Sequence, residues 1–329
     1  MTDVVPAWLK PNLLPDDVSA ALHGQLVFVT GANGFLGRHV CASLHSIGAR
    51  LLTPSSRELD LTHQEQVEQF IATHRPQYVV HLAAACGGIG ANVDNPGRFL
   101  YENALMGLML LDACRRHDVT KFTLISTTCA YPKHARLPLT EDQLWDGKPV
   151  GATGPYGVAK RLLHEAIESY HTQYGFNGIV LVPANLYGPG DHFQPDRSHV
   201  VPAMIRRYVE AREQGQACVL NWGTGKPTRE FLFVRDAAEA IVLALARHHD
   251  PMPVNIGTGV ETSIKSLASD IAELSQYSGE LQWDSSKPDG QPRRYLDVTR
   301  SKSFGFTAGT ALKDGLRETI EWFEHHPSR

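Results

Sequence analysis

The chain has 329 residues, of which 42% are hydrophobic, and its formal net charge is −4. This length supports one large or two modest domains with a substantial core, and the nearly balanced charge argues against a nucleic-acid or membrane partner. Five cysteines without close pairing fit reduced thiols better than a disulfide framework or a zinc site, so we expect a cytoplasmic globular protein without a bound metal.

The chain begins with a proline-punctuated extension, residues 1–24. It lacks the cationic start and the apolar block of a secretion signal. No other segment predicts a membrane span, because the longest apolar run covers only residues 104–111. The sequence assigns the extension no role, and we expect it either to drape over the first domain or to remain mobile.

A glycine-rich turn follows the first predicted strand, residues 25–29. It reads Thr30-Gly31-Ala32-Asn33-Gly34-Phe35-Leu36-Gly37 and leads into a helical pattern. Such glycines allow a tight turn and a close backbone approach, and the helix N-terminus faces the pyrophosphate of a dinucleotide. Glycine occurs in many strand-to-helix turns, but three in register after a buried strand favour nucleotide binding.

Strands and helices then alternate along the chain. Further strands are expected at residues 49–52, 78–82, 122–125 and 178–182, with helices at 64–73, 98–116 and from Tyr156 to about Tyr174. This order predicts an α/β fold of the Rossmann type, a doubly wound parallel sheet with helices on both faces. Ligands should lie beyond the carboxyl ends of the strands, where the glycine turn, Ala83, Thr127 and Asn185 fall.

The character of the chain changes after Asn185. Residues 186–198 are rich in Gly, Pro, Asp and His and predict a loop, which is followed by a helix over 200–212 and by short strands at 217–221 and 229–234. A helix at 236–246 and a strand at 253–256 are expected to return to the main sheet. The predicted parts are the extension 1–24, a nucleotide-binding domain of residues 25–185 plus about 235–258, and a smaller C-terminal substrate lobe of residues 186–234 and 259–329.

Tyr156 and Lys160 form the most informative pair of polar residues. Four residues apart on a helix, they share one face. A phenol has an ordinary pKa of ~10, and a nearby ammonium favours the phenolate and lowers that pKa. With the hydroxyl of Thr127, this pair can give a proton to a carbonyl oxygen while hydride reaches the carbon. Alone, the Tyr-x-x-x-Lys pattern is more often a helix surface pair.

The glycine turn, Thr127 and the Tyr156/Lys160 pair together resemble the extended short-chain dehydrogenases/reductases that act on nucleotide sugars. A narrower resemblance, from about Gln25 to the C-terminus, is to the GDP-L-fucose synthase family. Members of this family epimerise GDP-4-keto-6-deoxymannose at carbons 3 and 5 and then reduce carbon 4 with NADPH. The segments that resemble it are Gly87-Gly88-Ile89-Gly90-Ala91-Asn92, Cys129-Ala130-Tyr131-Pro132-Lys133, Asn185-Leu186-Tyr187-Gly188-Pro189, Ser198-His199-Val200-Val201-Pro202-Ala203, Trp222-Gly223-Thr224-Gly225 and Arg229-Glu230-Phe231-Leu232.

The resemblance implies that Cys129 is the base and His199 the acid of the epimerisation. Inverting a ring carbon requires a group on each face of the ring, one to remove a proton and one to return it. Without the resemblance, Cys129 would be interpreted as a small buried hydrophobic residue. His192 and His134 are the alternatives to His199.

The resemblance further implies that Tyr156 and Thr127 hydrogen-bond to the ketone oxygen, with Lys160 beside the phenol, and that Tyr156 gives this oxygen its proton during reduction. Thr127 replaces the more usual serine of the family and keeps the hydroxyl. Without catalysis, the same fold would be a nucleotide-binding scaffold, but the intact set of three residues counts against that reading.

NADPH is the cofactor that the resemblance implies. Pro54 occupies the place of the arginine that usually meets the 2′-phosphate, and Arg57 follows three positions later. No acidic residue ends the second strand, which disfavours NAD. The implied cofactor-binding residues are Gly31, Asn33, Gly34, Phe35, Leu36, Gly37, Arg57, Asp60, Leu61, Leu82, Ala83, Ala84, Asn103, Tyr156, Lys160, Pro183, Asn185, Leu186 and His199.

The expected partner is a GDP-sugar substrate, held by arginines whose forked donors suit a diphosphate. The implied residues are Arg207, Trp222, Arg229 and Arg294, although Arg206 could take the place of Arg207. Related substrates, a GDP-4-keto-heptose or a 3,6-dideoxy sugar of the colitose type, stay open, as does a reductase-only or epimerase-only variant. A homodimer through the helices at 98–116 and 156–174 is also implied, with simple core packing as the competing explanation.

Overall fold

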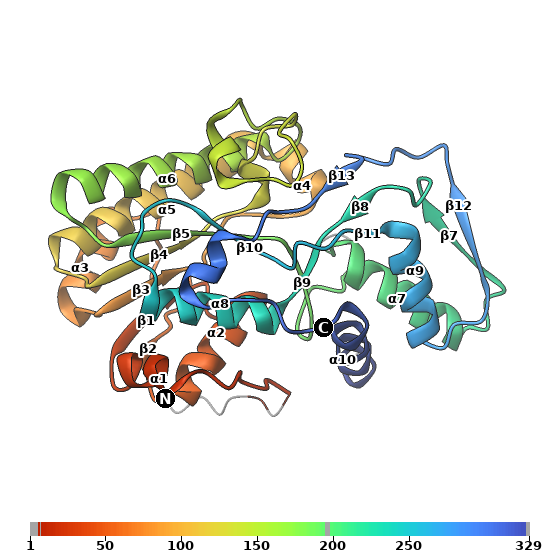
Figure 1. The fold of residues 1–329 in the computed structure, drawn as a ribbon, viewed down its shortest axis with the longest axis horizontal. Coiled ribbons are helices and arrows are strands. Elements are labelled where there is room, and N and C mark those ends of the chain that lie inside the picture. The colour runs from red at the N-terminus through yellow and green to blue at the C-terminus, as the bar shows by residue number, and fades with distance from the viewer. Residues whose placement is uncertain (1–5, 7, 195–197, 327–329) are drawn as a thin grey trace.

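The computed structural model describes residues 6, 8–194 and 198–326. Its centre is a six-stranded sheet of order β10-β5-β4-β3-β1-β2, in which every pairing is parallel (Figure 1). The chain runs outward from β1 in both directions, so the predicted Rossmann-type, doubly wound α/β fold is confirmed. The strands are β1 (Leu26–Thr30), β2 (Arg50–Leu52), β3 (Tyr78–His81), β4 (Lys121–Ile125), β5 (Gly178–Pro183) and β10 (Val254–Ile256).

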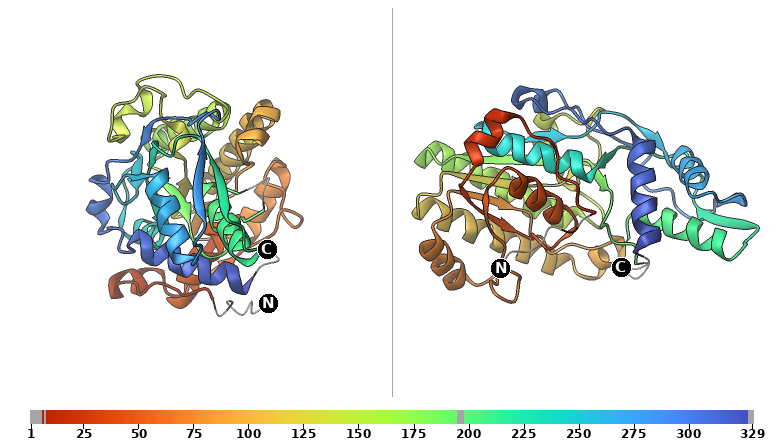
Figure 2. Two further views of the ribbon diagram at one scale, coloured as in Figure 1. Left: turned by 90° about the vertical axis from the view of Figure 1, so that its right-hand side faces the viewer. Right: turned by 90° about the horizontal axis from the view of Figure 1, so that it is seen from below.

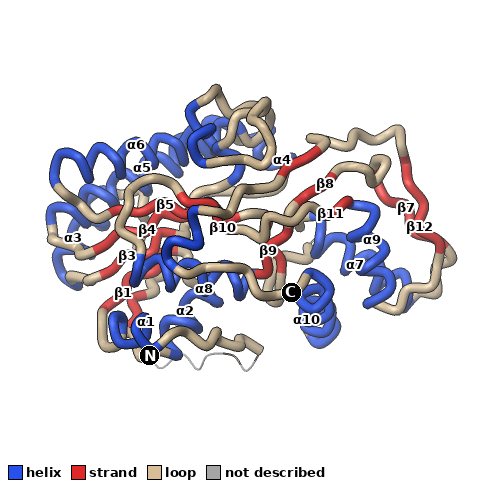
Figure 3. The backbone as a smooth tube through the Cα atoms, in the orientation of Figure 1, coloured by secondary structure: helices blue, strands red, loops and turns tan. Residues whose placement is uncertain are grey.

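Helices cover both faces of this sheet (Figure 3). One face carries α1 (Asp16–Leu22), α2 (Phe35–Ser46) and α8 (Val234–Arg247), and the other carries α3 (Gln64–His74), α5 (Pro96–Arg116) and α6 (Gly154–Tyr174). The central strands are buried on both sides, as their continuous apolar sequences require. No helix in the described part of the chain is long and apolar enough to cross a membrane.

Helix α5 lies against α6 at the closest point through Gly107. A Cβ atom at this position would lie 2.3 Å from Leu163 Cδ1, so a larger residue would require the Leu163 side chain to move. The short helix α4 (Ile89–Asp94) precedes α5 and packs against it.

A smaller lobe with its own apolar core stands beyond the carboxyl ends of the strands (Figure 2). Its helices are α7 (Val200–Glu213), α9 (Ile264–Leu274) and α10 (Leu312–His325). Three small sheets accompany these helices. In the first, β7 (Cys218–Trp222) pairs with β12 (Glu280–Asp284), and in the second, β6 (Asn185–Tyr187) pairs with β9 (Phe231–Phe233). In the third, β8 (Thr228–Arg229) lies between β11 (Thr262–Ser263) and β13 (Arg293–Arg294).

Two predictions for this region were wrong in part. Residues 186 and 187, at the start of the predicted loop, belong to β6, and the single strand expected at 229–234 is divided at Glu230. The buried carboxylate of Glu230 accepts backbone hydrogen bonds from Thr258, Gly259 and Leu296, and this inward-facing charge interrupts the ladder. The predicted return of residues 253–256 to the main sheet is confirmed, because β10 pairs with β5.

The N-terminal extension packs on the first domain in its described part, the first of the two alternatives. Val18 and Leu22 of α1 belong to the main core, and Asp17 forms a two-pronged ion pair with Arg247 of α8 at 2.6 and 2.8 Å. Trp8 lies edge-on to Trp322 of α10, so the extension also touches the smaller lobe. Residues 1–5 and 7 lie outside the described part of the chain.

We expect Leu22→Ala to lower the free energy of unfolding by about 2–5 kcal/mol, because this side chain is 0% exposed and its loss leaves a cavity. The matched control is Leu13→Ala in the same extension, where leucine is 101% exposed and a change within about 0.5 kcal/mol is expected. Urea unfolding measures both. Equal stability of the two variants would show that α1 does not stabilise the domain.

Candidate active site

The glycine turn between β1 and α2 forms a cradle that only glycines fit. Gly31 has a φ of +68°, and a Cβ atom there would lie 2.9 Å from the backbone nitrogen of Ala83. A Cβ at Gly37 would lie 2.2 Å from the carbonyl oxygen of Gly31. The residue that caps the N-terminus of α2 is Gly34, which has no side chain to accept a hydrogen bond from the helix. The first backbone N–H groups of α2 are therefore open to the cradle. These features suit a pyrophosphate.

The end of β3 forms the next wall of this cradle. The Thr30 hydroxyl accepts hydrogen bonds from the backbone nitrogens of Leu82 and Ala83, both at 3.1 Å, and so ties β1 to β3. Asn103 is buried in α5, where its amide oxygen accepts from the Ala85 nitrogen and its amide nitrogen donates to the carbonyls of Ala85 and Phe99. The polar atoms of Asn103 therefore hold the 82–85 segment in place.

The loop after β2 holds the residues expected to select the cofactor. Arg57 is exposed there. The Ser55 hydroxyl donates to Glu58 at 2.8 Å, so this serine already has a carboxylate partner. Asp60 accepts hydrogen bonds from Thr62, and Leu61 is buried.

Helix α6 and the segment after β4 bring four predicted catalytic residues together. Lys160 is buried, its ammonium donates to the Ile125 carbonyl at 2.9 Å, and it lies 5.9 Å from the centroid of the Tyr156 ring. Thr127 caps the short 3₁₀ helix Thr128–Ala130, and its hydroxyl accepts from the Cys129 nitrogen at 3.1 Å. The Cys129 segment packs directly on the helix that carries Tyr156, because a Cβ atom at Gly157 would lie 2.2 Å from the Cys129 carbonyl oxygen.

The expected lowering of the Tyr156 pKa is wrong for this structure. Burial of the phenol raises its pKa above the ordinary value, and neighbouring Cys86 and Cys129 add to the rise. Burial also lowers the pKa of Lys160 to about 8. Desolvation is the largest cause of the rise, so Tyr156 carries its proton at neutral pH.

The sequence analysis missed two groups beside this set. Ser126 and His164 are buried, and the Ser126 hydroxyl lies 2.6 Å from His164 Nε2. Burial and the nearby Lys160 lower the His164 pKa to about 3, so the imidazole is neutral. Cys86 follows the 82–85 segment and interacts electrostatically with both Lys160 and Cys129. The helical spacing of His164, four residues after Lys160, was the available signal.

His199 comes from the other lobe, where it caps the N-terminus of α7. Partial desolvation lowers the pKa of its ring, and the charge of His192 lowers it further. A neutral imidazole is therefore favoured near pH 7. No hydrogen bond within the described chain joins His199 to Cys129 or Tyr156, and residues 195–197 before it lie outside the described part.

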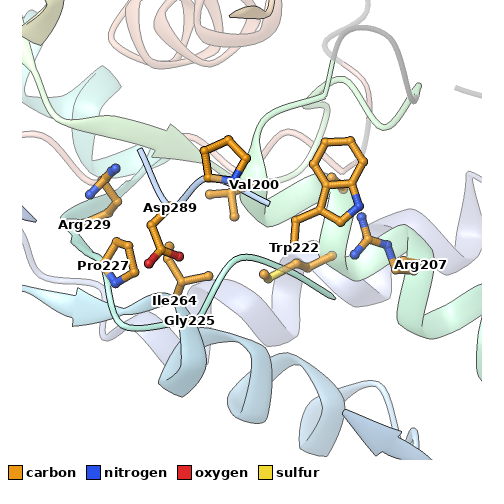
Figure 4. A pocket seen from close by; sticks show the side chains of 11 residues that line it. Val200, Arg207, Trp222, Gly225, Pro227, Arg229, Ile264 and Asp289 are labelled. Atoms are coloured by element: carbon orange, nitrogen blue, oxygen red, sulfur yellow. The ribbon is translucent and has the colours of Figure 1, made fainter. Parts of the chain in front are cut away.

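The residues expected to bind substrate gather at a pocket of about 290 Å³ in the smaller lobe (Figure 4). Arg207 and Trp222 lie together on one side and Arg229 on the other. Arg206 instead forms an ion pair with Glu210 at 2.6 Å, so the structure places Arg207 and not Arg206 in the pocket. Arg294 is not among the residues of the lining, but β13 sets it directly beside Arg229.

Asp289 and Lys287 were missed although both lie near this pocket. Asp289 accepts from the backbone nitrogen and the hydroxyl of Thr224 at 2.6 and 2.7 Å, which holds the 285–292 segment over the pocket. Lys287 lies 5.8 Å from the ring centroid of Trp222. The charged run Lys287-Pro288-Asp289-Gly290, which contains a proline, could have indicated these two residues.

Comparison with known proteins gives this geometry its family. The model of the "NAD dependent epimerase/dehydratase family" matches residues 27–257, and the chain belongs to that family. It is 40% identical over 302 residues to a probable GDP-L-fucose synthase 1 of Oryza sativa subsp. japonica, covering 91% of this chain and 92% of that protein.

Solved structures agree with the fold. A GDP-6-OMe-4-keto-L-xylo-heptose reductase of Campylobacter jejuni superimposes with a TM-score of 0.85 at 28% identity, covering 92% of this chain and 98% of its own. A GDP-L-fucose synthetase of Naegleria fowleri bound to NADP gives a TM-score of 0.84 at 26% identity, covering 93% and 95% of the two chains.

Asp191 lies on the turn after β6 and is a buried carboxylate with a high pKa. Its Oδ1 accepts from the His192 nitrogen at 2.7 Å, whereas its buried Oδ2 has no hydrogen-bond partner in the described chain. Burial raises the pKa of this carboxyl from 3.8 to about 7. The folded protein therefore holds a proton that the unfolded chain releases above its ordinary pKa.

The contribution of Asp191 to the free energy of unfolding should fall as the pH rises from about 4 to about 7, because in this window its folded-state carboxyl binds the extra proton. Asp191→Asn removes the titration, and at about pH 8 we expect it to exceed the original chain by about 1–4 kcal/mol. The gain should shrink as the pH is lowered toward about 4. Urea unfolding across this range measures it, with exposed Asp94→Asn as the control; a gain independent of pH would contradict the assignment.

Proposed function

We propose that this protein makes GDP-L-fucose by epimerising GDP-4-keto-6-deoxymannose at carbons 3 and 5 and then reducing the carbon-4 ketone with NADPH. The observation that carries the proposal is the meeting of Thr127, Cys129, Tyr156 and Lys160 at the end of β4. The pocket with Arg207, Trp222 and Arg229 supplies a second element, since paired arginines suit a diphosphate.

In the proposed epimerisation, the thiolate of Cys129 removes a proton from a carbon beside the ketone, and His199, after taking a proton from solvent, returns one from the opposite face. The 4-keto group makes the protons on carbons 3 and 5 acidic, and the resulting enolate oxygen needs hydrogen-bond donors. The hydroxyls of Tyr156 and Thr127 are placed to supply them. His199 comes from the smaller lobe, so the two lobes present their groups to the sugar from separate elements.

In the proposed reduction, Tyr156 gives its proton to the oxygen on carbon 4. NADPH, when bound, supplies the hydride for that carbon. The raised pKa of Tyr156 keeps the phenol protonated and able to donate. Lys160, held by the Ile125 carbonyl, stabilises the negative charge that develops on the phenol oxygen as the proton leaves.

The glycine cradle fits the pyrophosphate of a dinucleotide. The bare N-terminus of α2 and the missing Cβ atoms of Gly31 and Gly37 leave room that side chains would fill. We assign Arg57 to the 2′-phosphate, because it is exposed in the loop after β2. We further propose that the main sheet with its helices forms the cofactor domain and the smaller lobe the substrate domain, and that the protein works in the cytoplasm, where its five free cysteines stay reduced.

With GDP-4-keto-6-deoxymannose and NADPH in D₂O, we expect deuterium at carbons 3 and 5 of the product sugar, measured by NMR. Cys129→Ala should lower this incorporation by a factor of about 10²–10⁴, because the base is lost. Tyr156→Phe should slow NADPH oxidation by a similar factor while exchange persists. Cys218→Ala, at an exposed cysteine of the other lobe, is the control and should change neither rate.

Normal inversion by Cys129→Ala would disprove the assigned base. The C. jejuni heptose reductase favours a second candidate, reduction of a GDP-4-keto-heptose. A colitose-type 3,6-dideoxy sugar is a third candidate, since a GDP-L-colitose synthase of Yersinia pseudotuberculosis is 33% identical to this chain. The mass and stereochemistry of the product distinguish these substrates. A product without deuterium at carbons 3 and 5 would show that the protein is a reductase without epimerase activity.

We also propose a homodimer formed by α5 and α6. These helices pack side by side and leave large apolar side chains at their surface: Leu100, Tyr101 and Leu162 are 38%, 64% and 44% exposed. A shared four-helix interface would cover them.

Tyr101→Glu combined with Leu162→Glu is expected to convert the dimer to a monomer, because each charge would lie in an apolar interface. Sedimentation velocity measures the change. Leu220→Glu, at a leucine on β7 that is 52% exposed, is the control and should leave the dimer intact. If the unsubstituted protein sediments as a monomer, the proposed dimer is wrong.

A further inference from the structure

A second hollow, of about 200 Å³, lies on the 132–150 segment that follows Cys129 along the chain. Its charged lining consists of Lys133, His134, Arg136, Asp146 and Lys148, and we call it the basic hollow. It shares no lining residue with the substrate pocket, so it is a separate site.

The cationic side chains of the basic hollow form no ion pairs with the described part of the chain. No ion pair or side-chain hydrogen bond within the described chain engages Lys133, Arg136 or Lys148, and Asp146 is the one acidic side chain in the lining. The two other acids of the same segment, Glu141 and Asp142, are paired with Arg300 at 3.5 and 2.5 Å. The hollow is therefore a positive region in a chain whose formal net charge is −4.

A buried arginine lies directly behind the wall of the hollow. Arg161 is 7% exposed, and its Nη1 donates to the carbonyl of Gly147, a lining residue, at 2.6 Å. Its Nε donates to the Ala130 carbonyl at 2.6 Å, whereas its buried Nη2 has no partner in the described chain. Its Cζ also lies 5.5 Å from the centroid of the Trp145 ring, and no carboxylate of the described chain forms an ion pair with it, so this guanidinium adds positive charge close to the lining.

The hollow is built before any ligand arrives. The buried side chain of Gln143 accepts from the backbone nitrogen of Arg136 at 2.6 Å and donates to the carbonyls of Arg136 and Pro138 at 3.2 and 3.3 Å. This brace fixes the turn that carries Arg136. A preformed site loses less conformational entropy on binding.

We propose that the basic hollow binds a small phosphate-class anion, of which pyrophosphate is the model ligand. At about 200 Å³ the hollow is smaller than the substrate pocket of about 290 Å³, and we take one or two phosphoryl groups as its ligand. The forked donors of Arg136 and the ammonium groups of Lys133 and Lys148 supply charge-assisted hydrogen bonds. The proposal does not depend on the reaction assigned above.

Calorimetric titration of the full chain with inorganic pyrophosphate tests it, at a constant ionic strength of about 0.15 M, with saturating GDP to fill the substrate pocket and saturating NADP to fill the glycine cradle. We expect one pyrophosphate per chain. Arg136→Gln with Lys148→Gln should weaken binding about tenfold or more, because two charge-assisted hydrogen bonds are lost. The matched control is Arg50→Gln with Lys10→Gln, exposed cations elsewhere on the surface, and it should bind as the original chain does.

Three results would overturn the site. These are no binding heat at millimolar pyrophosphate, unchanged affinity in the Arg136/Lys148 double variant, and binding that GDP or NADP abolishes. The last would place the anion in the substrate pocket or in the glycine cradle. Because all the substituted side chains are exposed, we expect the variants to fold, and a thermal unfolding scan of each with and without pyrophosphate gives a second measure of binding.

Discussion

The close fit of α6 against the segment after β4 determines the geometry of the candidate active site. A Cβ atom at Gly157 would lie 2.2 Å from the carbonyl oxygen of Cys129, so the helix can approach only because this residue is glycine. Three further contacts continue the seam, namely Lys160 with Ile125, Arg161 with Ala130, and His164 with Ser126. These contacts between α6 and the segment after β4 hold Tyr156 near Thr127 and Cys129.

The same seam explains the protonation states of the site. Because the helix excludes water from the strand end, it raises the pKa of Tyr156, lowers that of Lys160 to about 8 and keeps His164 neutral. A protonated phenol beside a partly charged amine can give up a proton and have the resulting charge stabilised. Desolvation, and not ion pairing, is the dominant electrostatic effect here.

The two lobes build their sites in different ways. The parallel sheet supplies the glycine cradle and the proton donors from consecutive strand ends, as doubly wound sheets do. The substrate pocket instead joins segments that are far apart in the chain, since β8 pairs with both β11 and β13. Glu230 holds this junction, because its carboxylate binds the backbone of residues 258, 259 and 296. The described part of the N-terminal extension adds contacts to both lobes through α1 and Trp8.

The sequence alone determined the Rossmann fold and the chemistry-bearing motifs, because both depend on local patterns. Strand-turn-helix alternation shows in the period of the apolar residues, and Gly31, Tyr156 and Lys160 stand at short, fixed spacings. The choice of Arg207 over Arg206, the division of the 229–234 strand at Glu230, the direction of the Tyr156 pKa shift and the basic hollow were decided only by the tertiary structure. Each depends on which groups the folded chain desolvates or brings together from distant positions, and no local pattern carries that information.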